Sequence, residues 1–323
     1  MNYKNTNNDI LKAGKELCDS NFINSISNLH IYPILIGTFI LWCQIIFAWY
    51  IALYLPLYFS FISLIIISAC HQAIVLWVHE GSHRLFQNRK LNDLWVNFFF
   101  ATPLGATVET YRANHLTHHA YLASEKDLDR WEFAFDIKGQ NFPKVIFKSL
   151  TGMYIFQTLQ KYLNNKSINK IQYSRILMSA FWNLTLLWLC IVHERWYLYF
   201  LLWLIPLFTI TKCLIIIRAT AEHQPADYKI NSNSFTPMKE TIRTTIPTWW
   251  TKWIFYQANF NYHVEHHMFP NIPFYNLPKL HKYLVERKFY ERFPDCLQSS
   301  PINRLNELSN SIIDTKVRRL QPQ

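Results

Sequence analysis

The stretch IYPILIGTFILWCQIIFAWYIALYLPLYFSFISLIIISACHQAIVLWV, residues 31–78, contains no Asp, Glu, Lys or Arg. As one helix, its 48 residues would be about 72 Å long, far more than the roughly 30 Å hydrocarbon core of a bilayer. It therefore predicts a hairpin of two membrane spans, near residues 33–53 and 56–78, with Pro33 and Pro56 in first helical turns. The alternative, two buried helices of a soluble protein, is disfavoured because such long charge-free runs are rare in soluble folds.

A second apolar pair follows later in the chain. Residues 176–192 are apolar, residues 196–217 are apolar apart from Lys212, and the short polar segment 193–195 separates them. This pattern predicts a second hairpin. The expected fold is therefore an all-α polytopic membrane protein with four transmembrane helices in two hairpins.

The arrangement of the hairpins predicts the topology. Residues 1–30, 79–175 and 218–323 should lie on one side, and of the 32 Lys and Arg only Arg195 lies at a hairpin tip. The positive-inside rule makes that side cytoplasmic. We expect residues 1–323 to form a single domain with a cytosolic helical cap.

Composition and charge indicate which classes of binding partner the protein has. The net charge of +11 accompanies no nucleic-acid-binding motif, so it favours anionic lipid headgroups and an acidic redox partner over nucleic acid. The six cysteines are scattered without a CxxC pair and signal no disulfide framework. Two shorter apolar pieces, residues 94–106 and 145–163, either lie at the membrane interface above or below the site or simply pack against the other helices.

Histidines gather in three clusters near the ends of the apolar runs: HEGSH at 79–83, HLTHH at 115–119 and HVEHH at 263–267. In a helix, these spacings put the imidazoles of a cluster on one side, within reach of a common point. Adjacent rings such as His118 and His119 point about 100° apart, so they suit two neighbouring ions better than one.

The number of histidines also favours two metals. Nine imidazoles shared between two ions give four or five each, whereas a single zinc takes four ligands. The predicted ligands are His79, His83, His115, His118, His119, His223, His263, His266 and His267. Imidazole alone does not choose among iron, zinc, copper and nickel.

Carboxylates near the clusters are expected behind this neutral ligand shell, where they would accept hydrogen bonds from the free ring nitrogens. The candidates are Glu80, Asp127, Asp129, Glu222 and Glu265.

Other residues near the clusters have less specific roles. His71 lies about 12 Å from His79 along a helix, too far to bind the same ion, so it is either a channel wall or a hydrogen-bonded core residue. His30, His193 and His281 are expected at the surface or the interface. Seven aromatic residues either line a substrate channel or pack as ordinary core: Trp77, Phe98, Phe99, Trp249, Trp250, Tyr256 and Phe260.

The three clusters, in this order and alternating with apolar hairpins, resemble the histidine boxes of the integral-membrane fatty acid desaturase superfamily. The segment NYHVEHHMFP at 261–270, continuing to PFYNLP at 273–278, is similar to its third box. The resemblance covers residues 31–285. It implies a non-haem diiron enzyme that uses O2 and two external electrons to desaturate the alkyl chain of a fatty acyl lipid. The box histidines would be iron ligands, and His223 matches an extra ligand after the fourth span.

Departures from the family pattern refine this expectation. The spacing of His79 and His83 is shorter than in stearoyl-type acyl-CoA desaturases, which favours an acyl-lipid or bacterial branch, and a bacterial inner membrane over endoplasmic reticulum. The His-Pro-Gly-Gly haem motif is absent, so a separate electron donor, a ferredoxin or cytochrome b5, is expected to dock on the basic face.

Three alternatives remain at this stage. Within the superfamily, a hydroxylase or ketolase would act on an alkyl, sphingoid or carotenoid chain. HEGSH is also an HExxH zinc-protease motif with Glu80 as general base, but it uses only two of the nine histidines. A haem or metal carrier is disfavoured because haem-binding histidines face one another inside spans.

Overall fold

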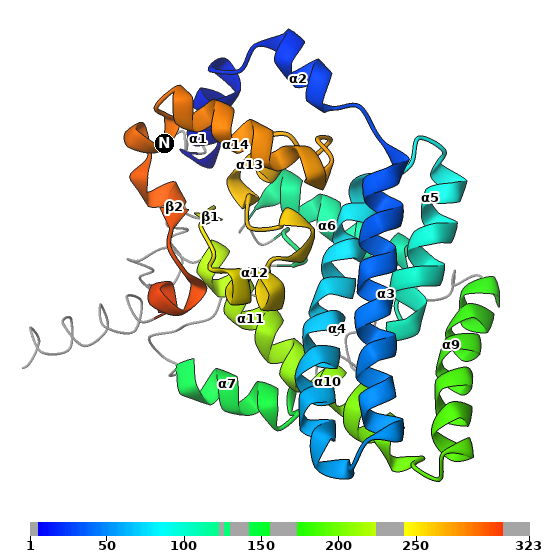
Figure 1. The fold of residues 1–323 in the computed structure, drawn as a ribbon. Helices are drawn as coiled ribbons and strands as arrows, with labels where there is room; N and C mark the ends of the chain where they lie inside the picture. Colours follow the sequence, from blue (N-terminus) through cyan, green and yellow to red (C-terminus); the bar gives the residue numbers. More distant parts are fainter. Residues whose placement is uncertain (1–5, 123–125, 130–141, 156–172, 224–241, 306–323) are drawn as a thin grey trace, which may run out of the picture.

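The computed structural model describes residues 6–122, 126–129, 142–155, 173–223 and 242–305. These residues are almost entirely helical (Figure 1). The strands among them are β1 (Thr244–Thr245) and β2 (Leu297–Gln298), which pair in parallel over two residues each. The prediction of an all-α fold is therefore confirmed.

Within the described residues, four helical segments are long and apolar enough to cross a membrane: Ile31–Tyr54, Leu57–His83, Tyr173–Val192 and Tyr199–His223. The first is α3 and the third is α9. The second joins η1 (Leu57–Phe59) to α4 (Ser60–His83), and the fourth joins the π-helical η6 (Tyr199–Leu204), α10 (Ile205–Phe208) and α11 (Ile210–His223). The prediction of four spans is confirmed. The second and fourth run beyond the predicted ends, so that His83 and His223 are their last helical residues.

The two helices of the first hairpin approach closely through small residues. Ala48 of α3 is buried and its carbonyl accepts a hydrogen bond of 2.8 Å from Ser63 Oγ of α4. Gly37 lies against the indole ring of Trp77, where a Cβ would overlap the ring. Because lipid tails are as apolar as the helices, this contact is stabilised by close packing and hydrogen bonds rather than by exclusion of water.

A charged residue joins the tips of the two hairpins. Arg195 Nη1 donates to the carbonyl oxygens of Ala52 and Leu55 at 2.7 and 2.8 Å, where α3 ends. These carbonyls have no partner within the helix, and a cation is favourable at the negative end of its dipole. The bond accounts for the single Arg at a hairpin tip.

The piece 94–106 packs within the helix bundle, which agrees with the packing alternative. It comprises the end of α5 (Arg89–Val96), the π-helical η2 (Asn97–Ala101) and η3 (Thr102–Leu104), and it packs against α4 and α9 with Phe100 fully buried. The segment turns back at Gly105, whose φ of 72° suits glycine. It thus enters the helix bundle and returns.

Side chains form hydrogen bonds with the backbone of this irregular segment and of Val108, which follows it in the chain. Trp182 Nε1 donates to the carbonyl of Phe98 at 2.6 Å, and Trp203 Nε1 donates to that of Pro103 at 3.3 Å. Asn97 Oδ1 accepts from the backbone N–H of Val108 at 3.0 Å. Non-helical backbone at membrane depth is stable only when protein groups satisfy it, and these three side chains do so.

The piece 145–163 is described in part. Its first half belongs to α7 (Phe142–Leu150), which packs against α11 with Val145 buried and Phe147 exposed. Such an amphipathic helix agrees with the interfacial alternative. Residues 156–163 lie outside the described residues.

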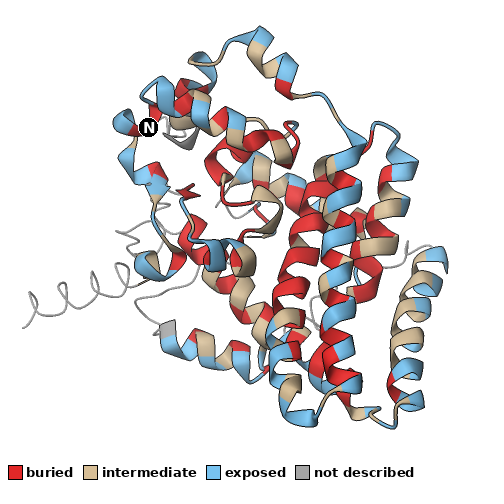
Figure 2. Ribbon diagram, viewed as in Figure 1, coloured by how far each residue is buried: buried red, intermediate tan, exposed pale blue. Residues whose placement is uncertain are grey.

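The remaining helices form a cap at one end of the spans (Figure 1). Its larger elements are α1 (Thr6–Glu16), α2 (Ser20–Ile26), α6 (Val108–Tyr121), α12 (Trp249–Phe255), α13 (His263–Met268), α14 (Leu277–Glu286) and α15 (Phe289–Arg292). The 3-10 turns η7 (Gln257–Asn259), η8 (Phe274–Asn276) and η9 (Pro294–Cys296) connect them. Figure 2 shows buried residues on α4, α11 and α13, whereas the outer faces of α3 and α9 are largely exposed. The cap therefore covers the ends of α4 and α11.

The glycine of the first histidine cluster generates a stability prediction. A Cβ at Gly81 would overlap both methyl carbons of the buried Val96 on α5. Gly81→Ala is expected to lower the melting temperature in detergent, because overpacking costs about 1–3 kcal/mol and exceeds the gain of up to about 1 kcal/mol in helix propensity. Val96→Ala should relieve the overlap, so the double variant should be more stable than the two single effects predict. Additive effects would contradict this contact.

Candidate metal centre

Four helices bring the predicted histidines together at the capped end of the spans. The ends of α4 and α11 supply His79, His83 and His223, while α6 and α13 supply the rest. All nine fall into two groups whose ring nitrogens lie within 4.8 Å of one another. The first group is His79, His83, His115, His119 and His266, and the second is His118, His223, His263 and His267.

The spacing of the nitrogens suits a shared cation. In the first group, His115 Nε2 lies 3.1 Å from His83 Nε2 and 3.0 Å from His119 Nε2. In the second, His263 Nε2 lies 2.9 Å from His223 Nε2 and 3.2 Å from His267 Nε2. Imidazole nitrogens about 2.1 Å from one metal and 90° to 110° apart would be separated by about 3.0 to 3.4 Å.

The tautomer of His115 strengthens this conclusion. Its Nδ1 faces Asp129 Oδ2 at 3.3 Å, and a neutral ring that donates there carries a lone pair on Nε2. That lone pair faces the Nε2 atoms of His83 and His119. Converging lone pairs repel unless a cation lies between them, so the donor set fits a bound metal ion.

The adjacent pairs divide between the two groups as the helix period predicts. His119 belongs to the first group and His118 to the second, and the same division separates His266 from His267. Since neighbouring residues on a helix differ by about 100°, each pair faces two sites at once. Helices α6 and α13 therefore link the two sites rigidly.

Burial favours the neutral form of five of these rings. Desolvation is the first cause, and the charges of neighbouring groups the second, that lower the pKa values of five histidines outside the spans well below the ordinary value of 6.5. They are His115, His119, His263, His266 and His267. Neutral imidazole is the form that binds metals.

Three of the five predicted carboxylates lie behind the rings. Glu80 Oε1 is 3.0 Å from His79 Nδ1, and Asp127 Oδ2 is 3.0 Å from His118 Nδ1. With Asp129 beside His115, they orient rings of both groups. Carboxylates in this position fix the tautomer and increase the basicity of the ligating nitrogen.

Glu222 occupies a different position. Its Oε2 accepts a hydrogen bond of 2.5 Å from Arg218 Nη1, one helical turn earlier on α11, and lies 4.0 Å from His263 Nε2. That nitrogen faces the other rings of its group. Glu222 is therefore on the metal side of His263 rather than behind its free nitrogen.

Glu265 faces away from both groups, so the prediction that it supports one of the nine rings is wrong. Its carboxylate accepts from Thr244 Oγ1 and Tyr290 Oη, and His281 Nδ1 lies 2.6 Å from it. Two residues along a helix correspond to about 200°, which turns Glu265 away from His263. The structure also corrects the surface position predicted for His281, whose side chain is only 15% exposed.

The other histidines stay outside the two groups. His71 is buried, with Nδ1 3.4 Å from Thr211 Oγ1 and its ring edge against Trp203, as expected for the hydrogen-bonded core alternative. His30 is exposed, and His193 contacts Tyr54 at the hairpin tip, in agreement with their predicted positions.

Of the seven aromatic residues near the clusters, Phe260 borders the centre. Its ring centroid is 4.6 Å from that of His79 and 5.1 Å from that of His263. Trp249 and Trp250 are 83% and 39% exposed, so the prediction that they line a channel is wrong. The other four contact aromatic or polar neighbours away from the nine rings.

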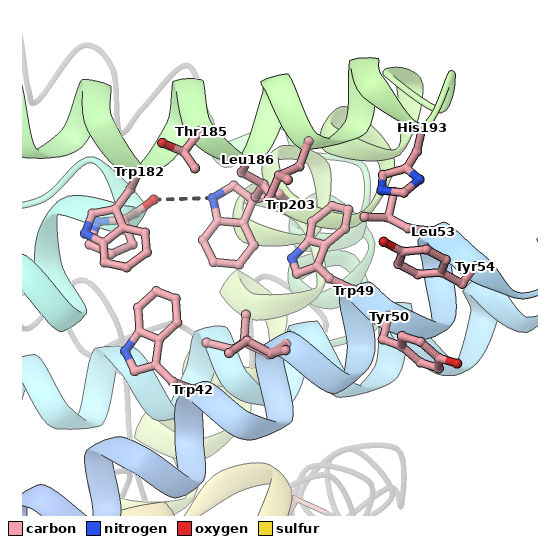
Figure 3. A pocket seen from close by; sticks show the side chains of 14 residues that line it. Trp42, Trp49, Tyr50, Leu53, Tyr54, Trp182, Thr185, Leu186, His193 and Trp203 are labelled. Atoms are coloured by element: carbon pink, nitrogen blue, oxygen red, sulfur yellow. Dashed lines mark hydrogen bonds between the residues drawn. The ribbon is translucent and has the colours of Figure 1, made fainter.

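An apolar groove lies away from the nine histidines, between α3 and α9 (Figure 3). It has a volume of about 420 Å³, and Trp42, Trp49, Trp182 and Trp203 line it, with His193 at one end. None of the nine histidines borders it. The groove is therefore separate from the metal centre.

The sequence did not predict that Arg218 would lie at the metal centre or that Glu265 would contact Thr244, His281 and Tyr290. Arg218 is 6% exposed and its guanidinium carbon lies 4.5 Å from the Phe260 ring centroid. The sequence signal is Arg218 and Glu222 one turn apart at the end of an apolar span, because such charges are rarely buried unless paired.

Comparison with known proteins agrees with this geometry. The sequence model of the family "Fatty acid desaturase" matches residues 55–296, which include all three histidine clusters and His223. The chain belongs to the fatty acid desaturase family.

Curated relatives are similar at lower levels of identity. The chain is 26% identical to a Δ6 fatty-acid desaturase of Caenorhabditis elegans over 71% of its own length and 60% of the relative's. It is 24% identical to a sphingolipid Δ4-desaturase of Schizosaccharomyces pombe over 70% and 61% of the two lengths. The corresponding values for a dihydrorhizobitoxine desaturase of Bradyrhizobium elkanii are 27%, 72% and 69%. The chain thus spans about six tenths of the first two relatives.

The carboxylate behind His118 provides a test of the geometry. Asp127→Asn is expected to weaken metal binding by the second group about 10- to 100-fold, because the amide holds the ring and its charge less well. Metal content after dialysis against graded chelator measures the effect. Glu109→Gln is the matched control, since Glu109 pairs with Arg175 rather than with an imidazole. Equal metal retention by both variants would contradict the role of Asp127.

Proposed function

We propose that the chain is a membrane-bound non-haem diiron oxidoreductase that uses O2 and two external electrons to desaturate the alkyl chain of a fatty acyl lipid. The observation that carries the proposal is the division of nine converging imidazoles, seven of them buried, into groups of five and four. Membership of the desaturase family supports iron as the metal.

The proposed ligands follow the two groups. One iron would be held by His79, His83, His115, His119 and His266, and the other by His118, His223, His263 and His267. Glu80, Asp127 and Asp129 orient rings from behind. When bound, the iron pair supplies the oxidising chemistry with O2 that removes hydrogen from an unactivated methylene. The chain buries seven of the nine rings and so limits access of water.

The zinc-protease alternative is disfavoured. A protease zinc uses three protein ligands and keeps a position open for water, whereas His79 and His83 share their group with three further imidazoles. Glu80 would be the general base, but its carboxylate lies 3.0 Å from the Nδ1 of His79. It therefore supports the ring instead of activating a water molecule.

Charges on the cap support a cytoplasmic site and a separate electron donor of the ferredoxin or cytochrome b5 type. The exposed lysines Lys12, Lys282 and Lys288 each lie within 4 Å of a Glu carboxylate. The positive charge beyond these pairs comes from three further exposed residues, Lys15 of α1, Lys279 of α14 and Arg287 after it. Helices α1 and α14 pack against α13, which carries three of the nine histidines. A basic surface near the centre suits an acidic donor.

The reaction class is supported by the relatives, whose names all describe desaturases. The test is to express the chain with a reductase system and to analyse host lipids and added carotenoids by mass spectrometry. We expect an alkyl chain that has lost two hydrogens. Gain of an oxygen would indicate the hydroxylase or ketolase alternative, and no oxygen-dependent product would contradict the proposal.

Two ligand variants test the two sites separately. His118→Ala and His266→Ala should each abolish product formation, and each should lower bound iron toward about one per chain, because each ring belongs to a different group. Iron analysis of purified protein measures this. His193→Ala at the hairpin tip is the control and should retain both irons. Full iron content and activity in either ligand variant would refute that assignment.

A further inference from the structure

A small cavity lies beside both groups of rings. It has a volume of about 30 Å³ and is bordered by His79 and His115 of the first group and by His118, His223 and His263 of the second, together with Arg218. That volume holds one or two water-sized molecules, but not an alkyl chain. The cavity is therefore the place where a small ligand would contact both sites.

Arg218 is the one Lys or Arg among the described residues that line this cavity. It is 6% exposed, and its Nη1 donates to Glu222 Oε2 at 2.5 Å. Its Nε is buried without a hydrogen-bond partner. Keeping a guanidinium with an unused donor out of water is costly, so its position requires an explanation beyond the single ion pair.

The charge of Arg218 is unfavourable beside two metal cations. The imidazoles of both groups carry no negative charge, and Glu222 supplies one carboxylate to the cation. Asp129 is the carboxylate among the described residues that line the cavity, and it faces the Nδ1 atom of His115. These two carboxylates do not balance two metal ions and a guanidinium.

The Phe260 ring contacts both Arg218 and His79: its centroid is 4.5 Å from the guanidinium carbon and 4.6 Å from the centroid of the His79 imidazole. Because Arg218 is buried against the Phe260 ring, little water reaches its guanidinium and the charge is poorly screened. A negative ligand in the cavity would relieve the repulsion.

We propose that this cavity is a binding site for a small anion of two or three atoms, and that Arg218 is the residue that selects its negative charge. The proposal rests on the proposed function, because it assumes metal in both groups. In the reaction with O2, the same guanidinium would stabilise negative charge where it develops. Glu222 balances Arg218 when the cavity holds no anion.

Azide is the probe for this site. It is added to the oxidised, iron-loaded, full-length protein, and its dissociation constant is obtained from the visible absorption change. Arg218→Met should weaken azide binding about 10- to 100-fold, the range expected for loss of a charge-assisted hydrogen bond. Arg218→Lys keeps the charge and should retain most of the affinity. Glu222→Gln leaves the cation unbalanced and should tighten binding.

A neutral ligand shows whether Arg218→Met weakens azide binding because the positive charge is lost or because the site is disrupted in general. Nitric oxide, added to the reduced protein, should bind Arg218→Met and the unaltered chain alike, because it carries no charge. Equal weakening of azide and nitric oxide, or weaker azide binding in Glu222→Gln, would overturn the proposal. Iron content is measured for every variant. If the unaltered chain binds no iron, the proposed function itself fails and this inference with it, whereas unchanged azide affinity in iron-loaded Arg218→Met refutes the inference alone.

Discussion

The convergence of neutral imidazoles at the ends of the spans is the constraint on which the rest of the structure depends. The lone pair of His115 Nε2 lies within 3.1 Å of two further ring nitrogens, and such an arrangement is stable only around cations. Four helices must therefore meet at fixed angles and depths. The buried carboxylates, the long second and fourth spans and the cap all serve to hold these rings in place.

A second constraint is that backbone groups inside the helix bundle must be hydrogen-bonded, and this constraint also affects the position of the imidazoles. Residues 97–104 leave the regular helix inside the bundle, and indole donors of Trp182 and Trp203 satisfy their carbonyls. This segment connects α5, whose Val96 packs on Gly81 of the first cluster, to α6, which carries the second cluster. Hydrogen bonding at membrane depth is thus linked directly to the geometry of the metal centre.

Around the centre, charge is arranged asymmetrically. Glu80 and Asp127 lie behind rings, and Asp129 lies behind His115 and also borders the cavity with Arg218. Glu222 pairs with Arg218 and lies 4.0 Å from His263 Nε2. Carboxylates behind the rings strengthen the ligands, and a cation beside the cavity favours a negative ligand. In this arrangement the carboxylates strengthen metal binding by the imidazoles, and Arg218 favours a negatively charged ligand in the adjacent cavity.

The sequence by itself determined the four spans, because charge-free runs of this length are stable only in a bilayer, and it determined the candidate ligands, because helical spacing is a local property. Only the tertiary structure decided which rings share a site, since His119 joins His83 and His266 across three helices. It also decided that Glu265 binds His281 and that Arg218 lines the cavity. Those outcomes depend on the depth and rotation of packed helices, which no local pattern specifies.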